Sequence, residues 1–149
     1  MPLPRASLYA QGEDVHVAVW PGNLRNTRDI TCFLAREGRS FVISASGLMH
    51  RDWIDKTLPH SDAIIDGARS LENGWLADGG SCIAGPDGEW LVEPIVEREA
   101  LAWADLEPAF IDRERQNFDP AGHYARPDVT RLVVDRRRQS TAEFEDSDS

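Results

Sequence analysis

The chain has 149 residues, a formal net charge of −10 and two cysteines. Its excess of 26 acidic over 16 basic side chains disfavours nucleic acid and anionic membrane surfaces as partners. No apolar run reaches the roughly 18 residues that a membrane-spanning helix needs, and no signal peptide follows Met1. Two cysteines are too few for a disulfide framework, so the composition predicts a cytoplasmic protein.

The first half of the chain has the pattern of a βαβ unit. Residues 15–20 are a β-branched run without strong polar alternation, which is typical of a strand covered on both faces. A helix is predicted to begin at an Asn26 cap and to end at Gly38. Its predicted apolar stripe comprises Ile30, Phe33 and Leu34. Residues 41–46 form the next predicted strand, which should pair in parallel with the first.

The middle of the chain lacks a regular pattern of polar and apolar residues. Residues 48–78 scatter charged side chains among isolated apolar ones, so we predict a long surface insertion that contains at most a short helix. The turn sequence at 85–88 then joins two predicted strands, 81–84 and 89–92, into a hairpin.

Three elements are predicted in the C-terminal third. Residues 100–106 form a further predicted strand, and a short helix is predicted near 110–115. The arginines at 136–138 are interpreted as part of a solvated tail in preference to a contact for an acidic partner. The polar residues after these arginines predict a disordered acidic tail over 139–149.

Residues suited to covalent catalysis are scarce. Cys32 lies inside the predicted helix, and Cys82 lies in a hairpin strand, where only a tertiary approach of His123 would activate it. Ser81 lacks the G-x-S-x-G context of a nucleophile elbow, and Lys56 is the sole lysine. We therefore interpret both cysteines as structural and assign no catalytic residue.

Metal and phosphate sites find little support in the motifs. His50 with Asp52, and His60 with Asp62, each place an imidazole two residues from a carboxylate, as a Zn²⁺ or Mn²⁺ site would require. Their spacing matches no compact site, so a solvated loop is the favoured interpretation and no metal is predicted. The glycine-rich stretches match neither a P-loop nor a dinucleotide fingerprint.

The ends of the two parallel strands are the better candidates for a binding site. Trp20, Pro21 and Gly22 follow the first strand, and Ser46 ends the second. Ligand crevices in α/β sheets form at the carboxyl ends of strands, so these four residues are predicted to line a substrate pocket. Packing of Trp20 on the sheet and capping of a turn by the serine is the alternative interpretation.

Several stretches, in the same order, resemble segments of nitrilases. Residues 8–12 and 15–22 resemble the segment that follows the nucleophile, and residues 26–30, 35–37 and 41–44 resemble the next helix and strand. Residues 79–90 resemble the late hairpin, and residues 116–129 resemble the long signature near the C-terminus of these enzymes. The resemblance covers about residues 1–138 and implies a partial domain over these residues, with the loop insertion at about 48–78.

The resemblance implies a carbon–nitrogen hydrolase with an αββα sandwich fold. In this family a cysteine thiolate attacks the nitrile, a glutamate acts as base and a lysine stabilises developing charge, without a metal or organic cofactor. All three residues come before the part of the family that this chain resembles. The chain is thus expected to be the C-terminal half of a nitrilase, with no catalytic residue of its own. Glu37 and His123 are expected to have structural or supporting roles.

Two functions of different kinds remain open at this stage. The first is part of a hydrolase that converts a nitrile or amide to a carboxylic acid and ammonia, inactive alone. The second is a non-catalytic module that docks on an intact nitrilase subunit or self-associates as a homo-oligomer, because half a sandwich exposes sheet edges and an apolar face. A residual binding domain that uses the Trp20 crevice is a third interpretation.

Overall fold

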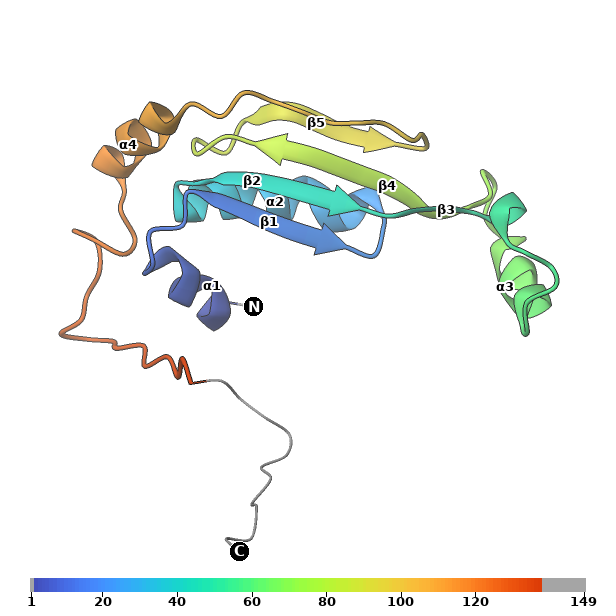
Figure 1. Cartoon of the computed structure of the whole chain (residues 1–149), viewed down its shortest axis with the longest axis horizontal. Helices are drawn as coiled ribbons and strands as arrows, with labels where there is room; N and C mark the ends of the chain where they lie inside the picture. Colours follow the sequence, from blue (N-terminus) through green and yellow to red (C-terminus); the bar gives the residue numbers. More distant parts are fainter. Residues whose placement is uncertain (1, 138–149) are drawn as a thin grey trace, which may run out of the picture.

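Five strands form one mixed sheet in the computed structural model, which describes residues 2–137 (Figure 1). The strands are β1 (Val15–Trp20), β2 (Phe41–Ser46), β3 (Leu48–His50), β4 (Trp75–Ala84) and β5 (Trp90–Val96). β1 pairs in parallel with β2, whereas β2, β3 and β5 all pair antiparallel with the long strand β4. The α/β class expected from the sequence is confirmed.

The predicted βαβ unit is confirmed, but its helix begins earlier than expected. Helix α2 (Leu24–Gly38) connects β1 to β2, and its N-cap is Asn23. Asn26 lies inside the helix, where its side-chain amide donates to the carbonyl oxygen of Gly22 at 2.8 Å. The cap comes from another strand: the backbone N–H of Leu24 donates to the carboxylate of Asp78 at 2.7 Å. A tertiary carboxylate therefore replaces the local cap.

The face that α2 buries also differs from the predicted stripe. Phe33 is 51% exposed, on the outer side of the helix. The buried positions of α2 are Thr27, Thr31, Leu34, Ala35 and Gly38. Small side chains and threonines line this face because the helix lies close to the sheet, and the threonine hydroxyls find hydrogen-bond partners there. The apolar core consists of Leu34, Ala35, Val42 and Ala84.

Only one face of β1 is covered, so the prediction of a strand buried on both faces is wrong for the described chain. Val15, Val17 and Val19 are 42%, 62% and 80% exposed. Helix α2 packs behind the sheet, and no element of the described chain covers β1 from the front in the view of Figure 1. Val15, Val17 and Val19 therefore share the face of β1 that the described residues leave uncovered.

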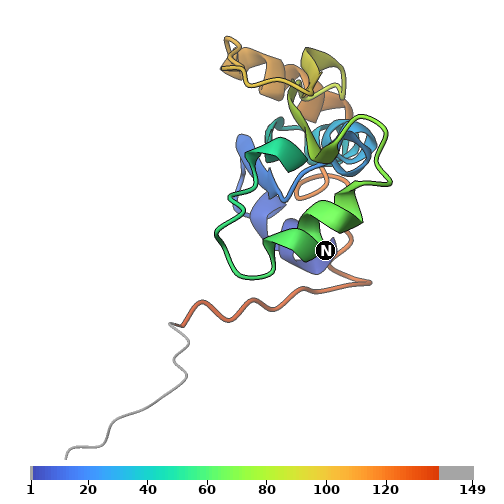
Figure 2. The same cartoon turned by 90° about the vertical axis from the view of Figure 1, so that its right-hand side faces the viewer.

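Residues 48–78 are more ordered than a loop insertion. They contain β3, a 3₁₀ turn (Arg51–Trp53), the confirmed short helix α3 (Ser61–Ala68) and the first residues of β4. The rings of His50 and Trp75 meet at 4.9 Å, and those of Trp53 and Trp75 at 5.2 Å. This aromatic cluster gives the segment a small packing centre of its own. Figures 1 and 2 show the resulting lobe at one end of the sheet.

The predicted hairpin is confirmed as β4 and β5, but the further strand at 100–106 is not. Residues 101–107 contain neither helix nor strand, and Leu101 and Trp103 are 89% and 73% exposed. Exposed and half-buried side chains alternate along residues 101–106, yet no neighbouring strand pairs with them within residues 2–137. An extended run becomes a strand only where a partner completes its hydrogen bonds.

Two further helices flank the sheet. Helix α4 (Pro108–Asn117) confirms the predicted C-terminal helix, and it docks through edge-to-face contact of Phe110 with Phe41 at 6.2 Å. Helix α1 (Pro2–Tyr9) was not predicted, because Pro2 and Pro4 disfavour the interior of a helix. Both prolines lie in the first turn, where they are tolerated because the N–H groups there have no partner within the helix. The predicted acidic tail at 139–149 lies outside the described residues.

Candidate functional site

The ends of β1 and β2 meet at one edge of the sheet, as predicted from their parallel order. Trp20 pairs with Ser46 in the strand register, and the N–H of Gly47 donates to the carbonyl oxygen of Trp20 at 3.3 Å. Gly22 is buried with φ of 137°, and a Cβ there would overlap the side chain of Ala77. Glycine is therefore needed where the chain leaves β1 and passes close to β4.

A pair of serines joins the sheet at this edge. The β2–β4 ladder stops at Ser44 and Cys82, and pairing resumes only at Leu48 and Asp78. Between these points the N–H of Ser46 donates to the hydroxyl of Ser81 at 3.0 Å, and that hydroxyl donates to the carbonyl of Ser46 at 3.3 Å. The Ser81 hydroxyl thus replaces backbone hydrogen bonds that the ladder lacks here, and the Ser46 hydroxyl donates to the carbonyl oxygen of Gly79 at 2.5 Å.

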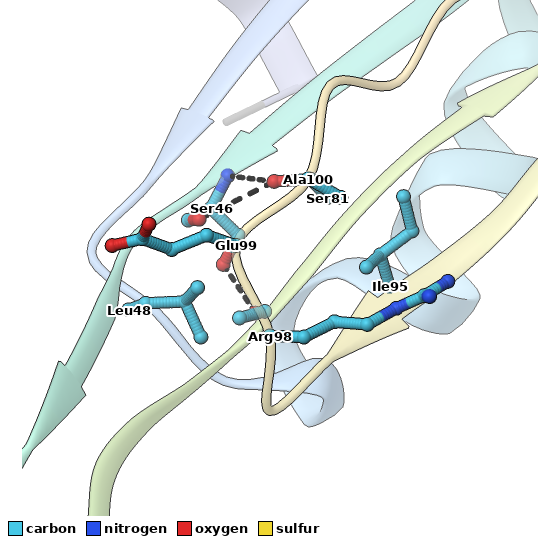
Figure 3. A pocket seen from close by; sticks show the side chains of 8 residues that line it. Ser46, Leu48, Ser81, Ile95, Arg98, Glu99 and Ala100 are labelled. Atoms are coloured by element: carbon cyan, nitrogen blue, oxygen red, sulfur yellow. Dashed lines mark hydrogen bonds between the residues drawn. The ribbon is translucent and has the colours of Figure 1, made fainter.

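A small cavity of about 200 Å³ lies beside the serine pair (Figure 3). It is lined by Ser46, Leu48, Gly79, Ser81, Ile95, Arg98, Glu99 and Ala100. The side chains of Arg98 and Glu99 point to opposite sides of the segment that follows β5. The volume is below the roughly 300 Å³ at which pockets for drug-sized ligands begin. The cavity therefore has room for only part of such a molecule.

Of the four predicted pocket residues, Ser46 lines this cavity, whereas Trp20, Pro21 and Gly22 do not. Pro21 is exposed and Gly22 is buried. Sequence reasoning missed Arg98 and Glu99. Their only signal in the sequence was a charged pair shortly after the second hairpin strand. That this segment passes beside Ser46 and Ser81 is a tertiary feature.

The indole of Trp20 is held by a buried polar network. Its Nε1 donates to the hydroxyl of Ser44 at 3.3 Å, and Ser44 shares a 2.7 Å hydrogen bond with the hydroxyl of Thr31. Thr31 also donates to the carbonyl oxygen of Thr27 at 2.6 Å. The indole is therefore held between α2 and the sheet. This matches the alternative interpretation of the sequence, in which Trp20 packs on the sheet instead of lining a pocket.

Neither cysteine has the lowered pKa that a nucleophilic thiol requires. Cys82 is 1% exposed, its Sγ donates to the Thr31 hydroxyl at 3.5 Å, and burial raises its pKa. Burial and nearby negative charge raise the pKa of Cys32 to about 11. Both changes disfavour the thiolate that nucleophilic attack requires. His123, the residue considered as an activator of Cys82, is exposed, and its ring lies 4.6 Å from that of Tyr124.

Glu37 links the first helix to the second. Its carboxylate accepts from Nε of Arg5 at 3.0 Å and from the hydroxyl of Tyr9 at 2.9 Å. Burial, together with the bond to Glu37, raises the pKa of Tyr9 to about 12. Because α1 contributes no buried residue, this polar cluster is a main anchor of α1 on the rest of the fold.

Residues 2–137 hold no group of three or more His, Cys, Asp or Glu side chains arranged to bind a metal ion. In the pair of His50 and Asp52, Nδ1 of His50 accepts from the backbone N–H of Asp52 at 3.3 Å, so the imidazole caps the 3₁₀ turn. His60 adopts a left-handed conformation at the start of α3. Within the same described range, every helix is too short or too polar to cross a membrane.

The fold is that of a carbon–nitrogen hydrolase. The carbon–nitrogen hydrolase of Helicobacter pylori G27 superposes with a TM-score of 0.60 at 16% sequence identity, over 89% of this chain and 46% of that one. No protein-family model matches the chain.

Sequence comparison narrows this class. The chain is 39% identical over 146 residues to a nitrilase of Pseudomonas syringae pv. syringae, covering 89% of this chain and 41% of that protein. It is 33% identical over 155 residues to an aliphatic nitrilase of Rhodococcus rhodochrous, covering 96% of this chain and 39% of that protein. The chain belongs to the nitrilase/carbon–nitrogen hydrolase superfamily. It spans about two-fifths of the length of these curated relatives.

Proposed function

We propose that this chain is the C-terminal portion of a nitrilase-type hydrolase, which converts a nitrile to a carboxylic acid and ammonia through a cysteine-bound thioimidate and acyl-enzyme. On this proposal the 149 residues alone are inactive, because the nucleophile, the base and the catalytic lysine belong to the preceding portion of the enzyme. No metal or organic cofactor takes part in the proposed reaction.

The uncovered apolar face of the sheet carries this proposal. Val15, Val17 and Val19 on β1 are 42%, 62% and 80% exposed. A stable soluble fold does not normally leave several large apolar side chains of one sheet in water, so such a face indicates a missing packing layer. The other half of an αββα sandwich would supply that layer.

The chain's own residues would form one wall of the substrate pocket. In the proposed complete site, the cavity beside Ser46 and Ser81 is the part of the pocket that this chain builds. Arg98 and Glu99 would set the polarity of its rim, and the Trp20–Gly22 turn would border it at the neighbouring strand end. Serine hydroxyls already engaged with the backbone can position a substrate but are not free to attack it.

The available nucleophiles support the proposal of inactivity in isolation. Burial raises the pKa of both thiols, and Cys82 is sealed beneath α2. Lys56 is exposed in the lobe, away from the strand-end cavity. A nitrile is weakly electrophilic and requires an activated nucleophile, a proton shuttle and fixed positive charge in one place.

The first experiment is an ammonia-release assay of the purified chain with a panel of aliphatic and aromatic nitriles and amides. The expected rate equals that of the blank, and the Cys82→Ala variant should behave identically. Turnover that Cys82→Ala abolishes would refute the proposal.

A second experiment restores the missing portion. In a chimaera, the chain replaces the matched region of the Pseudomonas syringae nitrilase and is thus joined to the part of that enzyme that it does not match. Ammonia release is expected from the fusion, and the Val19→Asp variant should lose it because a carboxylate would be buried between the layers. The matched Leu58→Asp variant, in the exposed lobe, should retain activity.

A non-catalytic assembly module is the second candidate, and the same uncovered face favours it. In this role the chain docks on an intact nitrilase subunit without completing an active site. Mixing the chain with an intact nitrilase and following sedimentation and turnover together separates the two roles. Co-sedimentation with a change in assembly size, and no activity in the fusion described above, would favour the module.

A further inference from the structure

Helix α1 is held on the fold by polar contacts instead of apolar packing. No residue of α1 is buried, and Leu3 is 69% exposed. Pro2, Leu3 and Ala6 line a cavity of about 490 Å³ together with Phe118 and Pro120. Figure 1 shows α1 as a separate short helix beside β1, outside the sheet. Apolar packing within the described residues therefore does not fix the direction of α1.

Two side chains one turn apart attach α1 to α2. Arg5 and Tyr9 lie on one face of α1, because residues four apart are neighbours on a helix surface. The Arg5 guanidinium lies 2.8 Å from the carboxylate of Glu37, and the Tyr9 hydroxyl donates to the same oxygen at 2.9 Å. The guanidinium also lies over the ring of Phe33, 5.8 Å from its centroid. Two attachment points about 6 Å apart along the axis restrain the direction of a helix as well as its position.

Gly38 makes room for this attachment. A Cβ at Gly38 would lie 2.6 Å from Cε1 of Tyr9, closer than carbon atoms that are not bonded can approach. Helix α2 is itself fixed on the sheet, since the hydroxyls of Thr31 and Ser44 share a 2.7 Å hydrogen bond and the N–H at its start donates to Asp78. A continuous series of contacts therefore leads from the sheet through α2 to α1.

We propose that Glu37 is a positioning residue of the complete hydrolase: through Arg5 and Tyr9 it orients α1, and α1 transmits this orientation to the nucleophile of the preceding portion. This role rests on the proposed function, in which the preceding portion continues directly into α1. Arg5 lies three residues after Pro2, about 4.5 Å along the helix axis. The fixed φ angles of Pro2 and Pro4 stiffen the first turn, so a tilt of α1 is passed on with little local adjustment. A displacement of about 1 Å at reacting atoms can lower a rate about a hundredfold.

Steady-state kinetics of the chimaera with the Pseudomonas syringae nitrilase test this role. Glu37→Gln removes the charge that holds Arg5 but keeps the size of the side chain. The expected result is a fall in kcat of about tenfold with a change in KM of less than about twofold, because the position of the nucleophile affects the chemical step more than substrate binding.

Glu114→Gln is the matched control. Glu114 accepts from Arg39 at 2.8 Å in a comparably buried ion pair, which joins α4 to the end of α2 and does not touch α1. The control variant should lose a similar ion pair but keep the kcat of the parent chimaera. Equal losses of kcat in the two variants, or no loss in Glu37→Gln, would overturn the positioning role.

Hydrogen exchange of the chain alone gives a readout that needs no catalysis. In Glu37→Gln the amides in the second half of α1 should exchange faster, whereas those of α2 keep their rates. Unchanged exchange in α1 would contradict the attachment itself. In the kinetic experiment, an inactive parent chimaera would count against the proposed function, and the positioning role would fall with it. An active parent with an unaffected Glu37→Gln variant would overturn the positioning role alone, so the two failures are distinguishable.

Discussion

The two faces of the sheet are made by the same strands, but they are covered to different extents, and the difference is largest at β1. Toward α2, Val42 and Ala84 are fully buried against Leu34 and Ala35. On the other side, the alternate residues Val17 and Val19 of β1 face water. The alternation of side chains along a strand means that one run of sequence supplies both faces. The difference lies in what covers each face: α2 covers one, whereas on the other side the described residues bury Phe41 against Phe110 of α4 but leave β1 uncovered.

The chemistry of the two faces also differs. The covered face contains polar side chains that satisfy one another, among them Trp20, Thr31 and Ser44. The uncovered side of β1 presents only valines. A polar network of directional hydrogen bonds fixes the position of one helix on the sheet. A uniformly apolar surface is instead typical of a face that packs against a second layer and excludes water. The uncovered face thus has the composition of an interior.

The largest expected effect contrasts truncation on the two faces. Leu34→Ala removes a buried side chain beneath α2 and should lower the free energy of unfolding by about 3 kcal/mol. Val19→Ala, on the uncovered face, should change it by less than about 0.5 kcal/mol. Urea denaturation followed by circular dichroism measures both. A comparable loss for Val19→Ala would show that the face is covered in solution, by self-association or by the chain itself.

The two cysteines should differ in how fast their thiols react. Burial raises the pKa of Cys32 to about 11 and also raises that of Cys82. At pH 8, Cys32 should react with a disulfide reagent about a hundredfold more slowly than an ordinary thiol, since less of it is thiolate. Cys82, which is 1% exposed, should react only when the fold opens. Rapid labelling of both residues in the native chain would contradict the described packing.

The cap of α2 is the next test, because Asp78 joins that helix to β4. Asp78→Ala should cost about 1 kcal/mol of stability, since the N–H of Leu24 loses its acceptor and the helix loses a favourable negative charge. Asp78→Asn keeps an acceptor oxygen and should cost less. Chemical denaturation of the three proteins provides the comparison, and equal stability of all three would show that Asp78 is not the cap.

The smallest effect concerns α1, which lies outside the layered region. Tyr9 has a pKa of about 12 in the folded chain, above its ordinary value near 10. A raised tyrosine pKa means that the folded state holds the proton more tightly, so this contribution to stability is complete below pH 10 and is lost as the pH rises toward 12. The free energy of unfolding should therefore fall between pH 9 and 11 by more in the wild type than in Tyr9→Phe. Identical pH profiles would contradict the cluster of Arg5, Tyr9 and Glu37.

Local signals in the sequence were sufficient for the regular elements. The β-branched runs at 15–20 and 41–46 predicted β1 and β2 to the residue, and the turn at 85–88 predicted the hairpin. Helix α2 was predicted, but its start was not, because its cap is the carboxylate of Asp78, more than fifty residues away in the chain. The strand predicted at 100–106 failed for a related reason, since pairing depends on a neighbour that local sequence does not specify.

The candidate site was predicted less completely than the fold. Ser46 was found because parallel strands end at one edge, and it does line the cavity there. Arg98 and Glu99 were missed because they reach that edge from a segment after β5. Trp20 was placed at the correct strand end, but its indole turns inward to Ser44, a choice that depends on the buried hydroxyls of α2.

The sequence by itself determined the α/β class, the parallel βαβ unit and the resemblance to nitrilases, because periodicity, turn residues and motif order are local properties of the chain. It also determined that reactive side chains are few. Only the tertiary structure decided that α2 covers one face of the sheet, that Cys82 is buried and Cys32 half-buried, and that a serine pair and a charged segment share one cavity. Those properties depend on distances between residues far apart in the chain, which packing sets and local sequence does not.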